Sequence, residues 1–267
     1  MPTWNAAQYL RFADERTRPC RDLAAALALE APRRIIDLGC GPGNSTAVLA
    51  ARWPDAETSG LDSSEAMILA ARRDAPQRTW AVGDIGTWKA PEEAPFDLVF
   101  SNAALHWVPD HDALYPRLLA QVSPGGALAT QVPNNMGAAA HEAMREIAAR
   151  PAWRAHFPVP VREWRVHPAS FYYDLLAPLA ARIDIWETEY LHVLPGPEAI
   201  VEWYKGSGLR PFLDALPDEG DRQRFLDDYL QAVTAAYPAR QAPLGGHVLL
   251  PFRRLFVIAY RASPHGG

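Results

Sequence analysis

The sequence predicts a doubly wound α/β fold with a helical cap inserted before the last strand. Short apolar segments typical of buried strands alternate with helical segments between residues 33 and 132. A glycine cluster follows the first of these strands, and after residue 132 the alternation stops. The 267 residues suffice for one large domain, or for one domain that carries an insertion.

Local patterns predict the elements of the first half. Two helices or turns are expected before residue 30, with Pro19 in the first turn of the second. A β-branched strand begins at Arg33, and Asn44, Ser45 or Thr46 is expected to cap the helix after the glycines. Further strands are expected near 57–61, near 78–82, from 96 and over 127–132, with helices over 64–73 and 111–122 and a turn at 124–126.

The second half is less regular. Residues 150–168 combine proline with aromatic residues and are expected to form a loop or short helices. Strand-like alternation returns from Ala181 and over 248–261, with helical stretches at 198–216 and 221–237 between. We expect these helices to form a cap, because substrate pockets often lie at such junctions.

Composition and charge exclude several classes of protein. A net charge of -5 without a basic cluster argues against nucleic acid as a partner. No apolar run approaches the roughly 20 residues that span a bilayer, and the first residues lack a signal-peptide pattern, so a cytoplasmic protein with no membrane partner is expected. Cys20 and Cys40 are too few for a disulfide framework or a four-ligand zinc site, and no metal is expected.

The glycine cluster points to a cofactor. Gly39, Gly41 and Gly43 allow a sharp turn and the close approach of a ligand to the backbone. Their spacing is G-x-G-x-G, which disfavours NAD and a nicotinamide oxidoreductase, because the dinucleotide motif is G-x-G-x-x-G. Taken alone, the cluster is equally consistent with a structural turn.

Aspartates at the ends of successive strands favour a ligand. Asp62 follows the glycines at the distance where a carboxylate accepts the ribose hydroxyls of an adenosine. Asp84 is placed to accept from the adenine amino group while the amide of Ile85 meets a ring nitrogen. Any one of them could be a turn residue, but together with Asp37 they indicate an adenosine ligand.

The sequence resembles the class I S-adenosylmethionine-dependent methyltransferases. The segments DLGCGPGNST, GLDSSEAM, GDI and FDLVFSNAALHWVPDH carry the resemblance over about residues 33 to 132. NNM, SGLRPFLDAL and LLPFRRLFVIAYR extend it, over nearly the full chain, to the branch that methylates trans-aconitate. It implies a Rossmann-like sheet of seven mostly parallel strands, S-adenosylmethionine as methyl donor, and a monomethyl ester of a tricarboxylate as product.

The resemblance also implies a division of the chain. An N-terminal helical segment over the cofactor site is expected in 1–30 and the donor-binding core in 31–149, followed by the substrate cap and sixth strand in 150–247 and the final strand and tail in 248–267. The residues expected to bind the donor are Asp37, Gly39, Cys40, Gly41, Gly43, Asp62, Ser63, Met67, Asp84, Ile85 and Asn102.

No acid or base is expected to take part in the reaction. A carboxylate acceptor is already ionised at pH 7. His106 follows the fourth strand, and we expect it to position the acceptor rather than abstract a proton, because the resembling family often has Gln there. Trp107 is expected to wall the transfer channel, although a core role is nearly as consistent with its position.

A tricarboxylate needs local positive charge on this acidic chain, and arginine suits carboxylates best. Arg210 is the leading candidate because it follows a glycine turn in the cap. Strand alternation turns only one of Arg253 and Arg254 inward, and the sequence leaves open which. The expected substrate-binding residues are Tyr9, Arg18, Arg210, Tyr173 and Arg254.

Two other functions stay open at this point. The glycine loop and the ribose aspartate do not identify the acceptor, so a methyltransferase of a hydroxyl or carbon acceptor is the main alternative. A non-catalytic S-adenosylmethionine-binding module is the second. The oligomeric state is not readable from the sequence.

Overall fold

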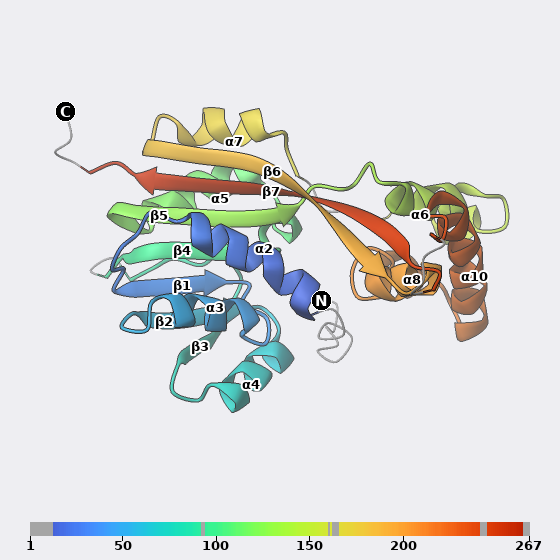
Figure 1. Ribbon diagram of the computed structural model, residues 1–267, viewed down its shortest axis with the longest axis horizontal. Helices are drawn as coiled ribbons and strands as arrows, with labels where there is room; N and C mark the ends of the chain where they lie inside the picture. The colour runs from blue at the N-terminus through green and yellow to red at the C-terminus, as the bar shows by residue number, and fades with distance from the viewer. Residues whose placement is uncertain (1–12, 92–93, 160, 162–165, 241–244, 264–267) are drawn as a thin grey trace. The chain divides into compact units, whose positions relative to one another are not determined.

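The computed structural model describes residues 13–91, 94–159, 161, 166–240 and 245–263, and in them the chain forms a seven-stranded sheet of order β3-β2-β1-β4-β5-β7-β6 (Figure 1). The strands β1 to β5 pair in parallel, and β7 is antiparallel to β5. This confirms the predicted fold class. The strands are β1 (Arg34–Leu38), β2 (Glu57–Asp62), β3 (Thr79–Val82), β4 (Phe96–Asn102), β5 (Val122–Pro133), β6 (Ala180–Leu194) and β7 (Val248–Arg261).

Helices connect β1 to β2, β2 to β3 and β4 to β5, and α8 to α10 lie between β6 and β7 in the chain, as predicted. Two short 3₁₀ turns, η1 (Leu105–Trp107) and η2 (Arg154–His156), follow β4 and α6. The helices are α2 (Ala13–Ala26), α3 (Asn44–Arg52), α4 (Glu65–Asp74), α5 (His111–Ala120), α6 (Ala139–Ala149), α7 (Ala169–Leu176), α8 (Pro197–Lys205), α9 (Arg210–Asp214) and α10 (Glu219–Ala236).

The chain divides into two compact units. Unit 1 comprises residues 1–133, 164–188 and 254–267, and unit 2 comprises residues 134–163 and 189–253. Unit 1 therefore holds the parallel strands and the glycine loop, whereas unit 2 holds α6 and the helices α8 to α10. The functional segments expected from the sequence stay a prediction.

In unit 1, α5 and α7 pack together over one apolar face of the sheet, and α2 packs against α3 (Figure 1). The buried cluster under α5 and α7 includes Leu38, Val99, Tyr115, Leu128 and Tyr172. Since β1 to β4 are parallel, their carboxyl ends meet at one edge of the sheet. This edge is where the candidate site lies.

In unit 2, α10 packs against α6 and α8. Trp153 anchors this packing, because its indole nitrogen donates to Asp228 over 2.7 Å and its ring meets Phe225 edge-on. Tyr204 and Tyr229 are fully buried between the helices. These side chains give unit 2 an apolar core of its own.

Local predictions about helix starts were wrong at two places. Pro19 lies inside α2 instead of opening a helix. The burial of Cys20, Leu23 and Ala24 along α2 offsets the loss of the one backbone donor that proline lacks. The cap of α3 is Gly43 in a left-handed conformation, with no side-chain cap. The expected caps Asn44, Ser45 and Thr46 lie inside the helix, where the hydroxyls of Ser45 and Thr46 donate to Asp37.

Two other elements also differ from the prediction. The expected turn at 124–126 is part of β5, which begins at Val122 and shifts register against β4. Gly126 allows this path, because a Cβ there would lie 2.5 Å from the carbonyl oxygen of Asp97. The helical stretch predicted over 198–216 is broken after Lys205 into α8 and α9.

Candidate active site

The loop between β1 and α3 turns through three glycines with positive φ. At Gly39, φ is +75° and an added Cβ would lie 2.2 Å from the Cβ of Ala104, so no larger residue fits. At Gly41, φ is +54° and an added Cβ would meet no atom within 4 Å. The loop is therefore crowded at its base and open at Gly41, as expected for backbone that a ligand approaches.

Asp37 stabilises the start of α3 from below. Its carboxylate is fully buried and accepts hydrogen bonds from the hydroxyls of Ser45 (2.6 Å) and Thr46 (2.7 Å). Burial raises the pKa of Asp37 to about 6, and the two hydroxyl hydrogen bonds act in the opposite direction. These bonds fix the position of the first turn of α3 at the end of β1.

Asp62 holds the loop from the neighbouring strand. One carboxylate oxygen accepts from the backbone N–H of Gly41 over 2.9 Å, and the other accepts from the N–H of Ser64 over 2.8 Å. The side chain is half-buried, and a carboxylate has lone pairs left for further donors. Asp62 can therefore bind a diol while it fixes the glycine loop.

The other predicted donor-binding residues lie at the same edge. Ser63 is exposed after β2, and Met67 is buried in the first turn of α4. Asp84 is exposed after β3 and accepts from the N–H of Gly86 over 2.8 Å. The side chain of Ile85 is buried next to the glycine loop, because a Cβ added at Gly39 would lie 3.5 Å from it. The structure thus brings the ends of β1, β2 and β3 together.

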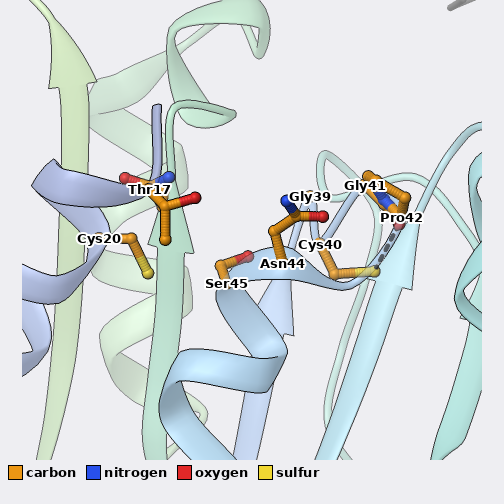
Figure 2. Close-up of a pocket in the computed structure, with 9 residues that line it drawn as sticks. Thr17, Cys20, Gly39, Cys40, Gly41, Pro42, Asn44 and Ser45 are labelled. Carbon is orange, nitrogen blue, oxygen red and sulfur yellow. Dashed lines mark hydrogen bonds between the residues drawn. The ribbon is translucent and has the colours of Figure 1, made fainter. Parts of the chain in front are cut away.

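A pocket lies beside the glycine loop (Figure 2). Among the predicted residues, Gly39, Cys40, Gly41 and Asn102 line it. The side-chain oxygen of Asn102 is buried and has no hydrogen-bond partner in the described structure, which marks it as an acceptor available to a ligand. The sequence reasoning missed the lining residues Thr17, Cys20, Pro42, Asn44 and Ser45.

Both pocket cysteines are inert thiols. Cys20 and Cys40 are buried, and burial raises their pKa values well above the usual range. Cys40 would contact a Cβ placed at Gly60 on β2 at 2.8 Å, so it fills space between the loop and the sheet. Neither thiol has the ionisation that nucleophilic chemistry requires.

His106 is a buried, neutral imidazole in η1. It is 5% exposed and its ring lies 5.0 Å from that of Trp107, centroid to centroid. Burial lowers its pKa to about 3, with the nearby charges of Arg254 and His111 acting in the same direction. His106 is therefore neutral at pH 7, and so weak a base is unsuited to abstracting a proton.

His111 and Tyr172 support η1 from behind. The Nδ1 atom of His111 lies 2.8 Å from the Tyr172 hydroxyl and Nε2 lies 3.0 Å from the carbonyl oxygen of Leu105. The Tyr172 hydroxyl also accepts from the N–H of His167 over 3.2 Å. This chain of bonds fixes the backbone that carries His106 and Trp107.

Strand β7 turns Arg254 inward and Arg253 outward. Arg254 is 3% exposed, and its Nη1 donates to the side-chain oxygen of Gln131 on β5 at 3.4 Å. The side chain of Arg253 is 53% exposed and lies 3.9 Å from Glu189. The sequence analysis did not single out Gln131 as a site residue, although a large polar side chain among the apolar residues of a buried strand was a usable signal.

The remaining predicted substrate residues lie apart in the chain. Arg18 is exposed on α2, and Tyr173 is 54% exposed on α7. Arg210 begins α9 in unit 2 and forms an ion pair with Asp214, with its Nε 3.6 Å from a carboxylate oxygen. Tyr9 lies outside the described residues.

Comparison with known proteins agrees with this geometry. A family model described as a methyltransferase domain matches residues 35–126. The trans-aconitate 2-methyltransferase of Methylobacterium radiotolerans is 50% identical over 266 residues, which cover 98% of this chain and all of the relative. That of Variovorax paradoxus is 46% identical, with the same coverage.

The chain belongs to the trans-aconitate 2-methyltransferase family. It is an S-adenosylmethionine-dependent methyltransferase that acts on a small molecule.

Solved structures share the fold. The YcgJ protein of Bacillus subtilis aligns with a TM-score of 0.57 at 13% identity, over 92% of this chain and 99% of that one. A phosphoethanolamine N-methyltransferase of Haemonchus contortus aligns with a TM-score of 0.56 at 14% identity, over 96% of this chain and 56% of that one. Among the residues described, no helix has the length and apolar character needed to cross a membrane.

Proposed function

We propose that this member of the trans-aconitate 2-methyltransferase family esterifies one carboxylate of trans-aconitate. The observation that carries the proposal is the 50% identity, over the whole length, to a relative of that name. The buried cation Arg254 beside the neutral His106 supports an anionic acceptor. We also propose that the enzyme works in the cytoplasm as a protein without nucleic-acid or membrane partners, as its composition predicts.

The residues at the edge of the sheet fit the methyl donor. Asp62 would bind the ribose hydroxyls, and Asp84 with the amide of Ile85 would bind the adenine ring. The open backbone at Gly41 and the buried oxygen of Asn102 suit a polar amino-acid group. S-adenosylmethionine supplies, when bound, a methyl group that its sulfonium charge already activates.

The protein's own task is then to orient the acceptor and exclude water. A carboxylate is ionised at neutral pH and attacks without losing a proton. His106, held neutral, can donate or accept one hydrogen bond that orients the acceptor, and Trp107 beside it can cover the apolar side of the path. We propose that Arg210 binds a carboxylate that does not react.

The test is to incubate the pure protein with methyl-labelled donor and a panel of carboxylates that includes trans-aconitate. A base-labile label on trans-aconitate is expected, because methyl esters hydrolyse in base. A label that survives base treatment, or that appears only on hydroxyl or carbon acceptors, would refute the ester. S-adenosylhomocysteine binding measured on the same sample shows that the protein is folded.

A further inference from the structure

A row of polar side chains crosses the centre of the sheet in unit 1. Asn102 on β4 is the register partner of Gln131 on β5. Register partners on adjacent strands point to the same face, and the bond from Arg254 to Gln131 places the arginine of β7 on that face too. Because Asn102 lines the pocket at the glycine loop, the row begins at the cofactor pocket and runs away from it.

The row contains an unused donor. Gln131 is fully buried, and its amide nitrogen has no hydrogen-bond partner in the described structure. Its amide oxygen accepts from Arg254, so the NH₂ group of the same amide is the part of the side chain that is left without a partner. A buried donor without a partner is costly unless a ligand supplies the acceptor.

The group that suits this row is an anion with more than one acceptor atom. A guanidinium presents several N–H donors in a plane, and Gln131 adds a further donor beside it. A carboxylate accepts from both kinds of donor at once. A carboxylate bound in this way has its oxygens engaged, which makes it a weaker nucleophile than a carboxylate of the same molecule that stands free.

We propose that Gln131 and Arg254 form a subsite for a carboxylate of the substrate that anchors it and is not methylated. The inference rests on the proposed function, because it assumes a polycarboxylate acceptor. It makes Gln131 a specificity-determining residue of the reaction.

The chain offers a matched control. Arg253 precedes Arg254 on the same strand, but its side chain is exposed. The experiment compares Gln131→Met, Arg254→Gln and Arg253→Gln in the full chain. Binding of trans-aconitate in the presence of S-adenosylhomocysteine is measured by calorimetry, and KM and kcat are measured separately.

Loss of a hydrogen bond to a charged group should weaken binding of trans-aconitate about 10- to 150-fold in Arg254→Gln, and about tenfold in Gln131→Met. KM should rise more than kcat falls, since the anchor does not react. Arg253→Gln should stay within about twofold. S-adenosylhomocysteine affinity should be unchanged in all three, and if Arg254→Gln does not fold, Gln131→Met still decides the question.

Dicarboxylates test the anchor directly. Itaconate, mesaconate and (Z)-glutaconate each lack one carboxylate of trans-aconitate. For the one that lacks the anchoring group, kcat/KM should be nearly equal in the wild type and Arg254→Gln, because the partner of the arginine is already absent. The subsite alone would be overturned if Arg254→Gln lowered kcat/KM equally for all three compounds. It would also be overturned if Gln131→Met and Arg254→Gln bound trans-aconitate as well as Arg253→Gln does. A wild type that neither binds nor methylates any of these acids would overturn the proposed function, and the subsite with it.

Discussion

At the scale of single residues, Asp62 combines two tasks. Its oxygens fix the amides of Gly41 and Ser64, and its remaining lone pairs are assigned to the donor's ribose. Such a residue affects ligand affinity both directly and through the loop it fixes.

We predict that Asp62→Ala weakens S-adenosylhomocysteine binding tenfold or more. A pair of charge-assisted hydrogen bonds contributes about 1.5 to 3 kcal/mol, and the loop loses a carboxylate acceptor as well. Calorimetric titration measures the affinity. Asp74→Ala, which removes an exposed aspartate paired with Arg73, is the control and should bind normally. Equal affinities in the two variants would place the adenosine elsewhere.

His106 gives a second test at this scale. Replacing it with glutamine should keep kcat within about tenfold, because the loss of a true general base typically costs 10² to 10⁴. The profile of kcat against pH should also lack a step near the ordinary histidine pKa, since burial lowers the pKa of His106 to about 3. A thousandfold loss of kcat with normal donor affinity would instead favour an acceptor that must be deprotonated.

At the scale of elements, the parallel strands and their helices were predictable because their patterns are local. Buried strands such as β4 are short apolar runs, and Ser64 accepts from the N–H of Met67 at the start of α4, where a helix was expected. The path of β5 was not predictable, because proline and two glycines normally signal a turn. The need for Gly126 inside the strand becomes visible only when β4 is placed beside it, because a Cβ at Gly126 would clash with the carbonyl oxygen of Asp97.

Gly126→Ala should destabilise the protein by about 1 to 3 kcal/mol, because its Cβ would lie 2.5 Å from the backbone oxygen of Asp97, which cannot move freely. Gly137→Ala is the matched control, since a Cβ there meets nothing within 4 Å. Urea unfolding measures both. Equal free energies of unfolding for the two variants would show that β4 and β5 can separate slightly at no cost.

The site was less predictable than the fold. The glycine loop and Asp62 follow motifs, whereas Gln131 acquires its meaning from Arg254, which lies 123 positions away in the chain. Strand alternation predicts that only one of Arg253 and Arg254 faces inward, but the phase of the alternation depends on the pairing with β5. Long-range register is the information that a single sequence lacks.

At the scale of the whole molecule, Arg210 of unit 2 tests the prediction that the cap binds the substrate. Arg210→Ala should lower kcat/KM for trans-aconitate roughly 10- to 150-fold, because a charge-assisted hydrogen bond contributes about 1.5 to 3 kcal/mol. Donor affinity should stay unchanged, and Arg210→Lys should recover part of the loss, because an ammonium retains the charge but not the planar fork. If both variants stay within about twofold, Arg210 has no part in substrate binding.

The buried ionisable groups also set how stability depends on pH. Burial lowers the pKa of His141 to about 4 and of His106 to about 3. Below pH 6.5, the ordinary histidine pKa, these side chains therefore bind protons in the unfolded chain but not in the native state. These groups make the free energy of unfolding fall as pH falls. Asp37 acts in the opposite sense, since its raised pKa of about 6 gives stability that is lost as pH rises through that value.

We therefore predict that His141→Gln reduces the loss of stability between about pH 7.5 and about pH 5 by about 1 to 2 kcal/mol. Urea unfolding at the two pH values measures the difference, and the partly exposed His247 replaced by glutamine is the control. An unchanged difference between the two pH values would mean that His141 is protonated as easily in the native state as in the unfolded chain.

The outward Arg253 and the inward Arg254 also constrain how this family can change in length. Inserting or deleting one residue within β7 would exchange the two arginines, so that Arg253 faced inward and Arg254 outward. It would at the same time turn the buried Leu255 and Val257 to the opposite face of the sheet. We therefore expect changes of length within the strand to be selected against. Homologous genes should accumulate insertions and deletions before this strand, whereas within it they should diverge by substitution alone.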